Sequence, residues 1–208
     1  MKVFDGKHML LVGAHPDDIE ISCGGTIAKY RSQISTCKSI IFAPCLEDPL
    51  NKGILEEYEK SMKMLGITEV LHHNYPRDIL ENYIQEIRDL LHSLKQSFNP
   101  EVIFCPSLND LHQDHRAIAS ACQTIFRDSA TVLSYEIVRS TVNFTPNFYV
   151  SLSQADMKFK LQLLKNYKTQ ARRSYFKPEI VKSIAIYRGC QVIVQYAEAF
   201  EIWRMTDK

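Results

Sequence analysis

The sequence lacks the features that would place it in a membrane, in a secretory pathway or on a nucleic acid. None of its apolar runs approaches the roughly 20 residues that a membrane-spanning helix needs. Its N-terminus lacks the basic, apolar and small-residue layout of a signal peptide, so we expect a cytoplasmic protein. Neither charge is in excess, because 25 lysines and arginines stand against 24 aspartates and glutamates. This balance argues against a nucleic-acid or membrane partner.

Cysteines are few and scattered, and no two of them form a C-x-x-C pair. This spacing argues against a disulfide framework and against a zinc site made of thiolates. We therefore expect reduced thiols, several of them in the core, at Cys23, Cys37, Cys45, Cys105, Cys122 and Cys190.

What the sequence does contain is a regular alternation of apolar runs and amphipathic stretches. Its 208 residues, 45% of them hydrophobic, fit one domain spanning residues 1–208. The alternation predicts an α/β fold, a Rossmann-like and mostly parallel sheet with helices on both faces. The expected strands are 8–13, 37–43, 69–73, 101–105, 131–138, 147–151 and 196–205. The expected helices are 25–33, 54–65, 80–97, 115–127, 154–167 and one beginning near 178.

Two loops that follow expected strands are rich in histidine and aspartate. The first contains His15, Asp17 and Asp18, and the second, residues 110–115, adds two histidines and two aspartates. Open α/β sheets bind ligands outside the carboxyl ends of their strands. A catalytic zinc commonly takes three His or carboxylate ligands and leaves its fourth position to water. His15, Asp18 and His115 can supply those three ligands.

Helix capping is the alternative explanation for each loop taken alone. The Pro-Asp-Asp of the first loop could cap a helix, because aspartate side chains accept the free N–H groups of a first turn. Asp110 and Asp114 could cap the next helix in the same way. Two such loops, each at a strand end, favour a metal site over two coincidental caps.

A dinucleotide-dependent oxidoreductase is a further possibility raised by the fold pattern alone. The turn after the first strand reads Gly13-Ala-His-Pro-Asp-Asp, which is not the G-x-G-x-x-G cradle of such enzymes. It would also place carboxylates against a pyrophosphate. We therefore discard this interpretation.

The same two loops resemble the paired signature motifs of the LmbE-like, or PIG-L-type, zinc N-deacetylases. The resemblance extends to the C-terminus and so covers nearly the whole chain. It rests on His15-Pro-Asp17-Asp18 with Glu20, Gly24-Gly25-Thr26, His112-Gln-Asp114-His115-Arg116-Ala117, residues 160–170, which resemble the family's helix ending in a His/Lys-x-x-Gln pattern, Arg188-Gly189 and residues 196–200.

The resemblance implies a role for each motif residue. His15, Asp18 and His115 would bind zinc, which lowers the pKa of its bound water to about 7. Asp17 would be the general base that takes a proton from that water. A protonated His112 would stabilise the oxyanion or protonate the departing amine, with Asp114 orienting its ring.

The resemblance further implies removal of an N-acetyl group from an amino sugar or glycoconjugate. Candidate substrates are small molecules of the GlcNAc type, nucleotide-linked sugars or thiol glycosides. Family members also form homo-oligomers, although no surface stripe in this sequence argues for one. Further candidates for substrate contact are Glu57, Arg77 and Tyr196, and Glu198, on the same strand face as Tyr196, would need a partner such as Arg188.

One family feature is missing. Many sugar deacetylases of this family carry an arginine three residues before a glutamate, and Ile54 and Glu57 occupy those positions here. Recognition of a simple GlcNAc-linked substrate is therefore not expected to follow the family. The missing arginine also motivates an alternative hypothesis, a non-catalytic domain that binds a sugar or nucleotide and keeps a vestigial metal site.

Overall fold

The computed structural model describes residues 3–205, whose strands form one sheet in the order β3-β2-β1-β4-β5-β7-β6. The strands are β1 (His8–Gly13), β2 (Thr36–Ile41), β3 (Glu69–His72), β4 (Val102–Pro106), β5 (Thr131–Tyr135), β6 (Phe148–Leu152) and β7 (Tyr196–Arg204). The main helices are α1 (Asp18–Tyr30), α2 (Ile54–Leu65), α3 (Ile84–Phe98), α4 (Gln113–Phe126), α5 (Gln154–Leu164) and α6 (Pro178–Cys190).

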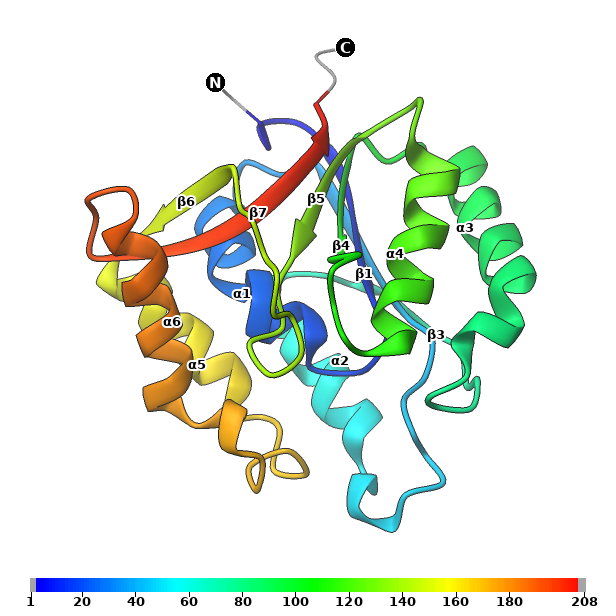
Figure 1. The fold of residues 1–208 in the computed structure, drawn as a ribbon, viewed down its shortest axis with the longest axis horizontal. Helices are drawn as coiled ribbons and strands as arrows, with labels where there is room; N and C mark the ends of the chain where they lie inside the picture. Colours follow the sequence, from blue (N-terminus) through cyan, green and yellow to red (C-terminus); the bar gives the residue numbers. More distant parts are fainter. Residues whose placement is uncertain (1–2, 206–208) are drawn as a thin grey trace.

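Five neighbouring strands, β3, β2, β1, β4 and β5, run parallel, and β7 runs antiparallel to both β5 and β6. Helices α3 and α4 cover one face of the sheet, while α1, α2, α5 and α6 lie on the other (Figure 1). The expected mostly parallel sheet with helices on both faces is confirmed. No helix among residues 3–205 is both long and apolar enough to cross a membrane.

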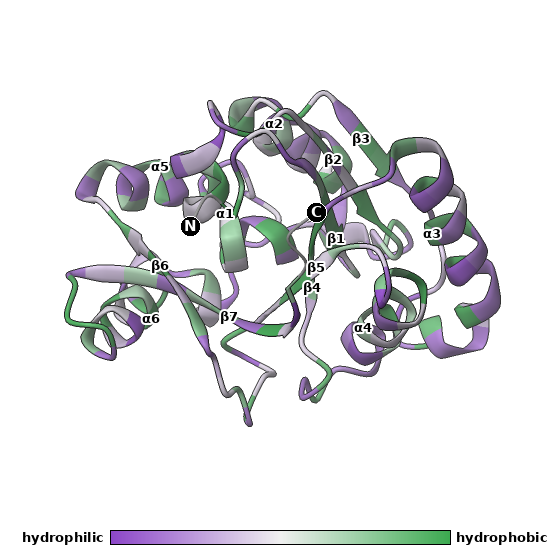
Figure 2. Ribbon diagram, turned by 90° about the horizontal axis from the view of Figure 1, so that it is seen from above, coloured by the Kyte–Doolittle hydropathy of each residue, from purple (hydrophilic) through white to green (hydrophobic). Residues whose placement is uncertain are grey.

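The central strands are buried on both faces, as parallel strands between helix layers must be. Along β1, Met9 and Leu11 pack toward α1 and α2, whereas Leu10 and Val12 pack toward α3 and α4. Figure 2 shows the result, with hydrophobic central strands and hydrophilic outer faces on the helices.

Helix α1 begins at Asp18, seven residues before the expected start, and it is the main boundary that the sequence placed wrongly. The expected start, Gly25, lies in the middle of the helix at a closely packed position. A Cβ on Gly25 would lie 2.6 Å from Leu152 Cδ1 and 3.0 Å from Glu198 Oε1. The early start places the motif carboxylates in the first turn of the helix.

The carboxylate of Glu198, on β7, binds the backbone in the middle of α1. This carboxylate accepts hydrogen bonds from the N–H groups of Gly25 (2.9 Å) and Thr26 (2.6 Å) and is paired with Lys160 Nζ at 2.5 Å. The predicted pairing of Glu198 with Arg188 was wrong, because Arg188 forms a bidentate pair with Glu136. A buried ion pair of this kind is stable only when its remaining lone pairs are also satisfied, as they are here.

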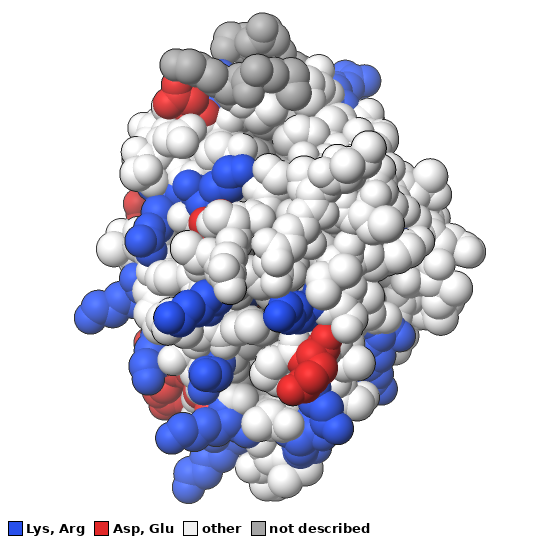
Figure 3. All heavy atoms as spheres, turned by 90° about the vertical axis from the view of Figure 1, so that its left-hand side faces the viewer, with Lys and Arg blue, Asp and Glu red and all other residues white. Residues whose placement is uncertain are grey.

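The net charge of +1 conceals an uneven distribution. The side of the molecule drawn in Figure 3 carries many more Lys and Arg than Asp and Glu side chains. Exposed basic residues of the C-terminal region include Lys168, Arg172, Lys177 and Lys182.

Candidate active site

The two histidine- and aspartate-rich loops meet where the strand order reverses. From β1 the sheet continues to β2 and β3 on one side and to β4 and β5 on the other, and the loops after β1 and β4 open at the same edge. This is the crevice in which open α/β folds bind ligands. A cavity of about 380 Å³ lies there, lined by His15, Asp17, Asp18, His112 and His115 among others.

The turn after β1 is held by the carboxylate of Asp18. Its Oδ2 atom accepts hydrogen bonds from the N–H groups of Ala14 and His15, each at 2.9 Å. Burial alone would raise the pKa of Asp18, but His115, and then His15 with its backbone N–H, lower it to about 2. Asp18 is therefore a fixed, ionised carboxylate, which is the form that a metal ligand requires.

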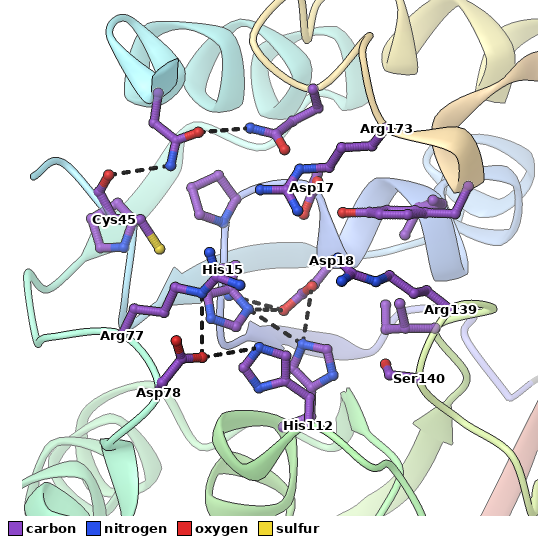
Figure 4. A pocket seen from close by; sticks show the side chains of 18 of the residues that line it. His15, Asp17, Asp18, Cys45, Arg77, Asp78, His112, Arg139, Ser140 and Arg173 are labelled. Atoms are coloured by element: carbon purple, nitrogen blue, oxygen red, sulfur yellow. Dashed lines mark hydrogen bonds and ion pairs between the residues drawn. The ribbon is translucent and has the colours of Figure 1, made fainter. Parts of the chain in front are cut away.

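The side chains of His15 and Asp18 lie close together in the cavity (Figure 4), and His115 completes a group whose ligand-type atoms lie within 4.8 Å of one another. His15 Nδ1 lies 3.3 Å from His115 Nε2 and 3.7 Å from Asp18 Oδ2, and His115 Nε2 lies 3.5 Å from Asp18 Oδ1. Ligand atoms about 2.0–2.1 Å from a tetrahedral zinc lie about 3.3 Å from one another. The three side chains therefore fit one such ion with little movement.

Each histidine of this group has a carboxylate behind it. His15 Nε2 lies 3.2 Å from Asp114 Oδ2, and His115 Nδ1 lies 3.0 Å from Asp110 Oδ2. A carboxylate in that position holds the ring proton on the far nitrogen and leaves the near nitrogen free to bind a metal. The near nitrogens are His15 Nδ1 and His115 Nε2, and both face the carboxylate of Asp18.

A second group, His15, His112 and Asp114, also brings ligand-type atoms together. However, the carboxylate of Asp114 already accepts hydrogen bonds from the N–H groups of Asp78 (2.7 Å) and Leu80 (3.0 Å). With the contact to His15 Nε2, these bonds engage both oxygens of the Asp114 carboxylate, whereas the two N–H bonds to Asp18 both fall on Oδ2 and leave Oδ1 facing His115 Nε2. The group containing Asp18 is the better candidate metal centre.

The two carboxylates beside His115 favour a positive charge at the candidate metal centre. Burial favours the neutral form of His115, but Asp18 and Asp110 outweigh burial and raise the pKa of His115 to about 10. The pair of carboxylates thus demands a positive charge on or beside the ring. A divalent cation between His15, Asp18 and His115 would satisfy that demand in place of the proton.

Asp17 occupies the helix N-cap position but makes no capping hydrogen bond through its side chain. Its backbone has a φ of 93°, a left-handed conformation that costs free energy for a residue other than glycine. Burial, and then the neighbouring Asp18 and Glu20, raise its pKa well above the usual value. A strained, buried carboxylate with raised basicity at the cavity wall suits proton transfer better than capping.

His112 caps helix α4 with its ring. Nδ1 accepts a hydrogen bond from the N–H of Asp114 (3.2 Å), so the proton of a neutral ring sits on Nε2, which lies 3.5 Å from Asp78 Oδ1. Burial, followed by His15 and His115, lowers the pKa of His112 to about 4. His112 is therefore a neutral N–H donor near pH 7, not the protonated imidazolium that the sequence suggested.

The expected role of Asp114 is corrected by these contacts. It was expected to orient His112, but its carboxylate lies against His15, and only its backbone N–H contacts the His112 ring. The reason is the short 3-10 helix Leu80–Tyr83, because its first turn and the preceding loop direct their N–H groups at the Asp114 carboxylate.

Of the three residues expected to contact substrate, only Arg77 lines the cavity. Glu57 instead accepts hydrogen bonds from the Thr169 hydroxyl (2.6 Å) and the Lys168 N–H (2.9 Å), so it braces the loop after α5. Tyr196 is buried, with the Lys182 ammonium 5.8 Å from its ring centre. Both assignments were wrong because neither side chain reaches the cavity.

Several cavity residues were not singled out from the sequence as parts of the site. Two of them had a signal in the sequence: Gln170 ends the stretch 160–170 that resembles the family's helix, and Arg173 belongs to a mildly basic C-terminal region. The others come from loops without periodicity or a motif. Gln170 donates to Asn51 Oδ1 (3.1 Å), which joins two of these loops across the cavity. The cavity lining further includes Asn51, Arg139, Ser140, Gln170, Arg173 and Tyr175.

Comparison with known proteins adds the family. Uncharacterized deacetylase YaiS of Escherichia coli strain K12 is 29% identical over 175 residues, covering 78% of this chain and 91% of that protein. Diacetylchitobiose deacetylase of Thermococcus kodakarensis is 23% identical over 221 residues, covering 93% of this chain and 82% of that protein.

The fold also matches solved structures. N,N'-diacetylchitobiose deacetylase from Pyrococcus horikoshii, complexed with its inhibitor MPG, superposes with a TM-score of 0.79 at 22% identity, covering 97% of this chain and 86% of that one. The family model PIG-L, described as GlcNAc-PI de-N-acetylase, matches residues 10–126, which contain both histidine- and aspartate-rich loops. The chain therefore belongs to the PIG-L family, and it is an amide hydrolase of the deacetylase type.

Proposed function

We propose that this protein is a zinc-dependent hydrolase that removes an N-acetyl group from an amino sugar or glycoconjugate. The observation that carries the proposal is the spacing of His15 Nδ1, His115 Nε2 and the Asp18 carboxylate, 3.3–3.7 Å apart, beside the buried carboxylate of Asp17. The donor set of two imidazoles and one carboxylate is one that zinc accepts in hydrolases.

When bound, zinc would polarise the amide carbonyl and acidify a water molecule. The remaining steps belong to the chain. Asp17 accepts a proton from the attacking water, and the burial that raises its pKa makes it a stronger base for this purpose. His112 donates its Nε2–H to the oxygen on which negative charge develops. The proton held by Asp17 then passes to the departing nitrogen, which leaves acetate and a free amine.

The amino-sugar assignment draws on the two diacetylchitobiose deacetylases among the similar proteins. The position where sugar deacetylases of the family carry an arginine is Ile54, whose apolar side chain lines the cavity. A substrate other than a simple GlcNAc glycoside is therefore proposed, with nucleotide-linked sugars and thiol glycosides as candidates. The cytoplasmic location, the homo-oligomer and the single domain over residues 1–208 stay predictions.

The test is metal-dependent acetate release. Purified protein is analysed for metal by mass spectrometry and assayed on a panel of N-acetyl sugars, nucleotide sugars and thiol glycosides. We expect about one zinc per chain, and acetate release that stops on chelation and returns with zinc. A protein that binds no zinc, or that releases no acetate from any member of the panel when loaded, would contradict the proposal.

The alternative, a non-catalytic binding domain with a vestigial metal site, is not favoured. A binding domain needs no base, yet Asp17 is held in a strained conformation at the cavity wall. It also needs no carboxylates behind its histidines, and both are in place, Asp114 behind His15 and Asp110 behind His115.

A further inference from the structure

Two arginines that belong to neither signature motif reach into the cavity from one side. Arg139 comes from the segment after β5 and Arg173 from the segment after α5, and both guanidinium groups are directed inward, opposite Arg77 (Figure 4). The two segments lie far apart in the sequence. Their meeting at the cavity is therefore a product of the fold rather than of a basic run.

Both guanidinium groups have unused hydrogen-bond donors. Within the described part of the chain, Arg139 and Arg173 form no ion pair and no hydrogen bond through their side chains, and the Nε of Arg173 is buried without a partner. Other arginines do pair: Arg77 lies 3.3 Å from Asp78 and Arg188 lies 2.7 Å from Glu136. The buried Nε of Arg173 is a costly unused donor unless a ligand satisfies it, whereas Arg139 is exposed and its donors are open to water or to a ligand.

Tyr175 positions both arginines without using their N–H groups. The guanidinium carbons of Arg139 and Arg173 lie 5.8 Å and 6.0 Å from the centre of the Tyr175 ring, within the range of cation–π contacts. Stacking of this kind leaves the hydrogen-bond donors in the guanidinium plane free. Planar donors of this kind match carboxylate and phosphate groups.

Most carboxylates at the cavity already have cationic or histidine partners. Asp18, Asp110 and Asp114 lie against the histidines of the candidate metal centre, and Asp78 lies 3.3 Å from Arg77 Nε. Arg139 and Arg173 pair with none of these carboxylates. They are therefore the cations of the lining that an anionic group on the substrate can reach.

We propose that the amine-bearing part of the substrate carries a carboxylate or phosphate group, which Arg139 and Arg173 bind together. The inference rests on the proposed deacetylase function and narrows its substrate class. It also accounts for Ile54, because recognition through a charged group on this wall replaces the arginine that other sugar deacetylases of the family carry on α2.

The test compares three N-acetyl probes: the methyl glycoside of N-acetylglucosamine, which is neutral, N-acetylglucosamine 1-phosphate and N-acetylmuramic acid. Binding to the zinc-loaded protein is measured by calorimetry, and acetate release is measured in parallel. We expect at least one anionic probe to bind on the order of 10-fold to 100-fold more tightly than the neutral probe. Whichever probe does so identifies phosphate or carboxylate as the group.

The variants Arg139→Ala and Arg173→Ala should remove this preference and leave binding of the neutral probe within about twofold. Binding is the deciding readout, because Arg173 also lowers the pKa of Asp17 and its loss can alter turnover. Arg139→Lys should recover only part of the preference, since a point charge lacks the planar donor pair. Arg172→Ala is the matched control, because Arg172 is exposed and lies outside the cavity lining.

Equal binding of the three probes, or no binding, would overturn the inference. So would an anion preference that survives in the double variant Arg139→Ala/Arg173→Ala. Acetate release from the neutral probe with no anion preference would refute the anionic substrate and leave the deacetylase standing. Arginine-dependent binding of an anionic probe without acetate release from any of the probes would support the anion site and count against the deacetylase.

Discussion

Asp114 Oδ2 lies 3.2 Å from Nε2 of His15, a residue 99 positions earlier in the chain. The same carboxylate accepts the N–H groups of Asp78 and Leu80, so it is fixed before any metal arrives. The contact joins the loops after β1 and β4 and selects which nitrogen of His15 faces Asp18. The geometry of the candidate metal centre therefore depends on a residue that does not itself bind the metal.

Replacing Asp114 with asparagine should weaken zinc binding without unfolding the protein. The amide no longer supplies a charge to hold the His15 ring proton, and loss of such a partner typically costs about 10-fold to 100-fold in metal affinity. Competition with a chromogenic chelator measures the Kd. Asp89→Asn, an exposed change on α3, is the control. Unchanged zinc affinity in Asp114→Asn would show that His15 needs no such partner.

Replacing Asp17 with asparagine should abolish turnover while zinc stays bound. General-base catalysis contributes about 10²-fold to 10⁴-fold, and the amide cannot accept a proton. Zinc content by mass spectrometry and kcat by acetate release test this prediction. Because burial raises the pKa of Asp17, its ionised form is destabilising, so the variant should also unfold at a higher temperature at neutral pH. An Asp17→Asn enzyme with normal kcat would refute the assignment as base.

Zinc binding should release a proton from His115 at neutral pH. In the metal-free protein Asp18 and Asp110 raise the pKa of His115 to about 10, so the ring is protonated at pH 7 and must lose that proton to bind a metal. Apparent zinc affinity should therefore rise about 10-fold per pH unit between pH 6 and pH 8. Calorimetry in buffers of different ionisation enthalpy counts the protons. A flat affinity profile with no proton release would contradict the described coupling.

Replacing Gly25 with alanine should destabilise the fold, although alanine is the better helix former. The added Cβ would contact Leu152 Cδ1 at 2.6 Å and disturb the Glu198 carboxylate at 3.0 Å. Overpacking of this kind costs about 1–3 kcal/mol in the free energy of unfolding, which urea denaturation measures. Gly24→Ala is the matched control. A Cβ at this position would lie no closer than 3.2 Å to its nearest neighbour, Leu163 Cδ1. The higher helix propensity of alanine should offset most of the cost of that contact.

The sequence predicted the sheet because the signals for it are local. Apolar runs marked the strands, and polar clusters after the first and fourth of them marked the edge where the cavity lies. Which atoms meet there was harder to predict. The Asp114 carboxylate turns to His15 because N–H groups near residue 80 hold it, and no spacing within either motif encodes that contact.

The substrate side of the cavity could be predicted least. Glu57 was assigned from a family pattern whose arginine is absent, and Tyr196 from strand alternation, which cannot say what covers a face. Arg139 and Arg173 lie in irregular segments, where neither periodicity nor a motif marks a functional side chain. Their positions follow from where α5 and β5 end in space.

The pair formed by Lys160 and Glu198 has a consequence for how this protein can be cut and how it can diverge. The match to the family model ends at residue 126. However, α1, which carries Asp18, donates two backbone N–H groups to the carboxylate of Glu198, far beyond that point in the chain. A fragment ending at residue 126 would leave those groups and the inner side of α1 exposed to water, so we expect no autonomous minimal enzyme. Lineages that change one member of the pair must change the other, which makes residues 160 and 198 a natural place to look for covariation.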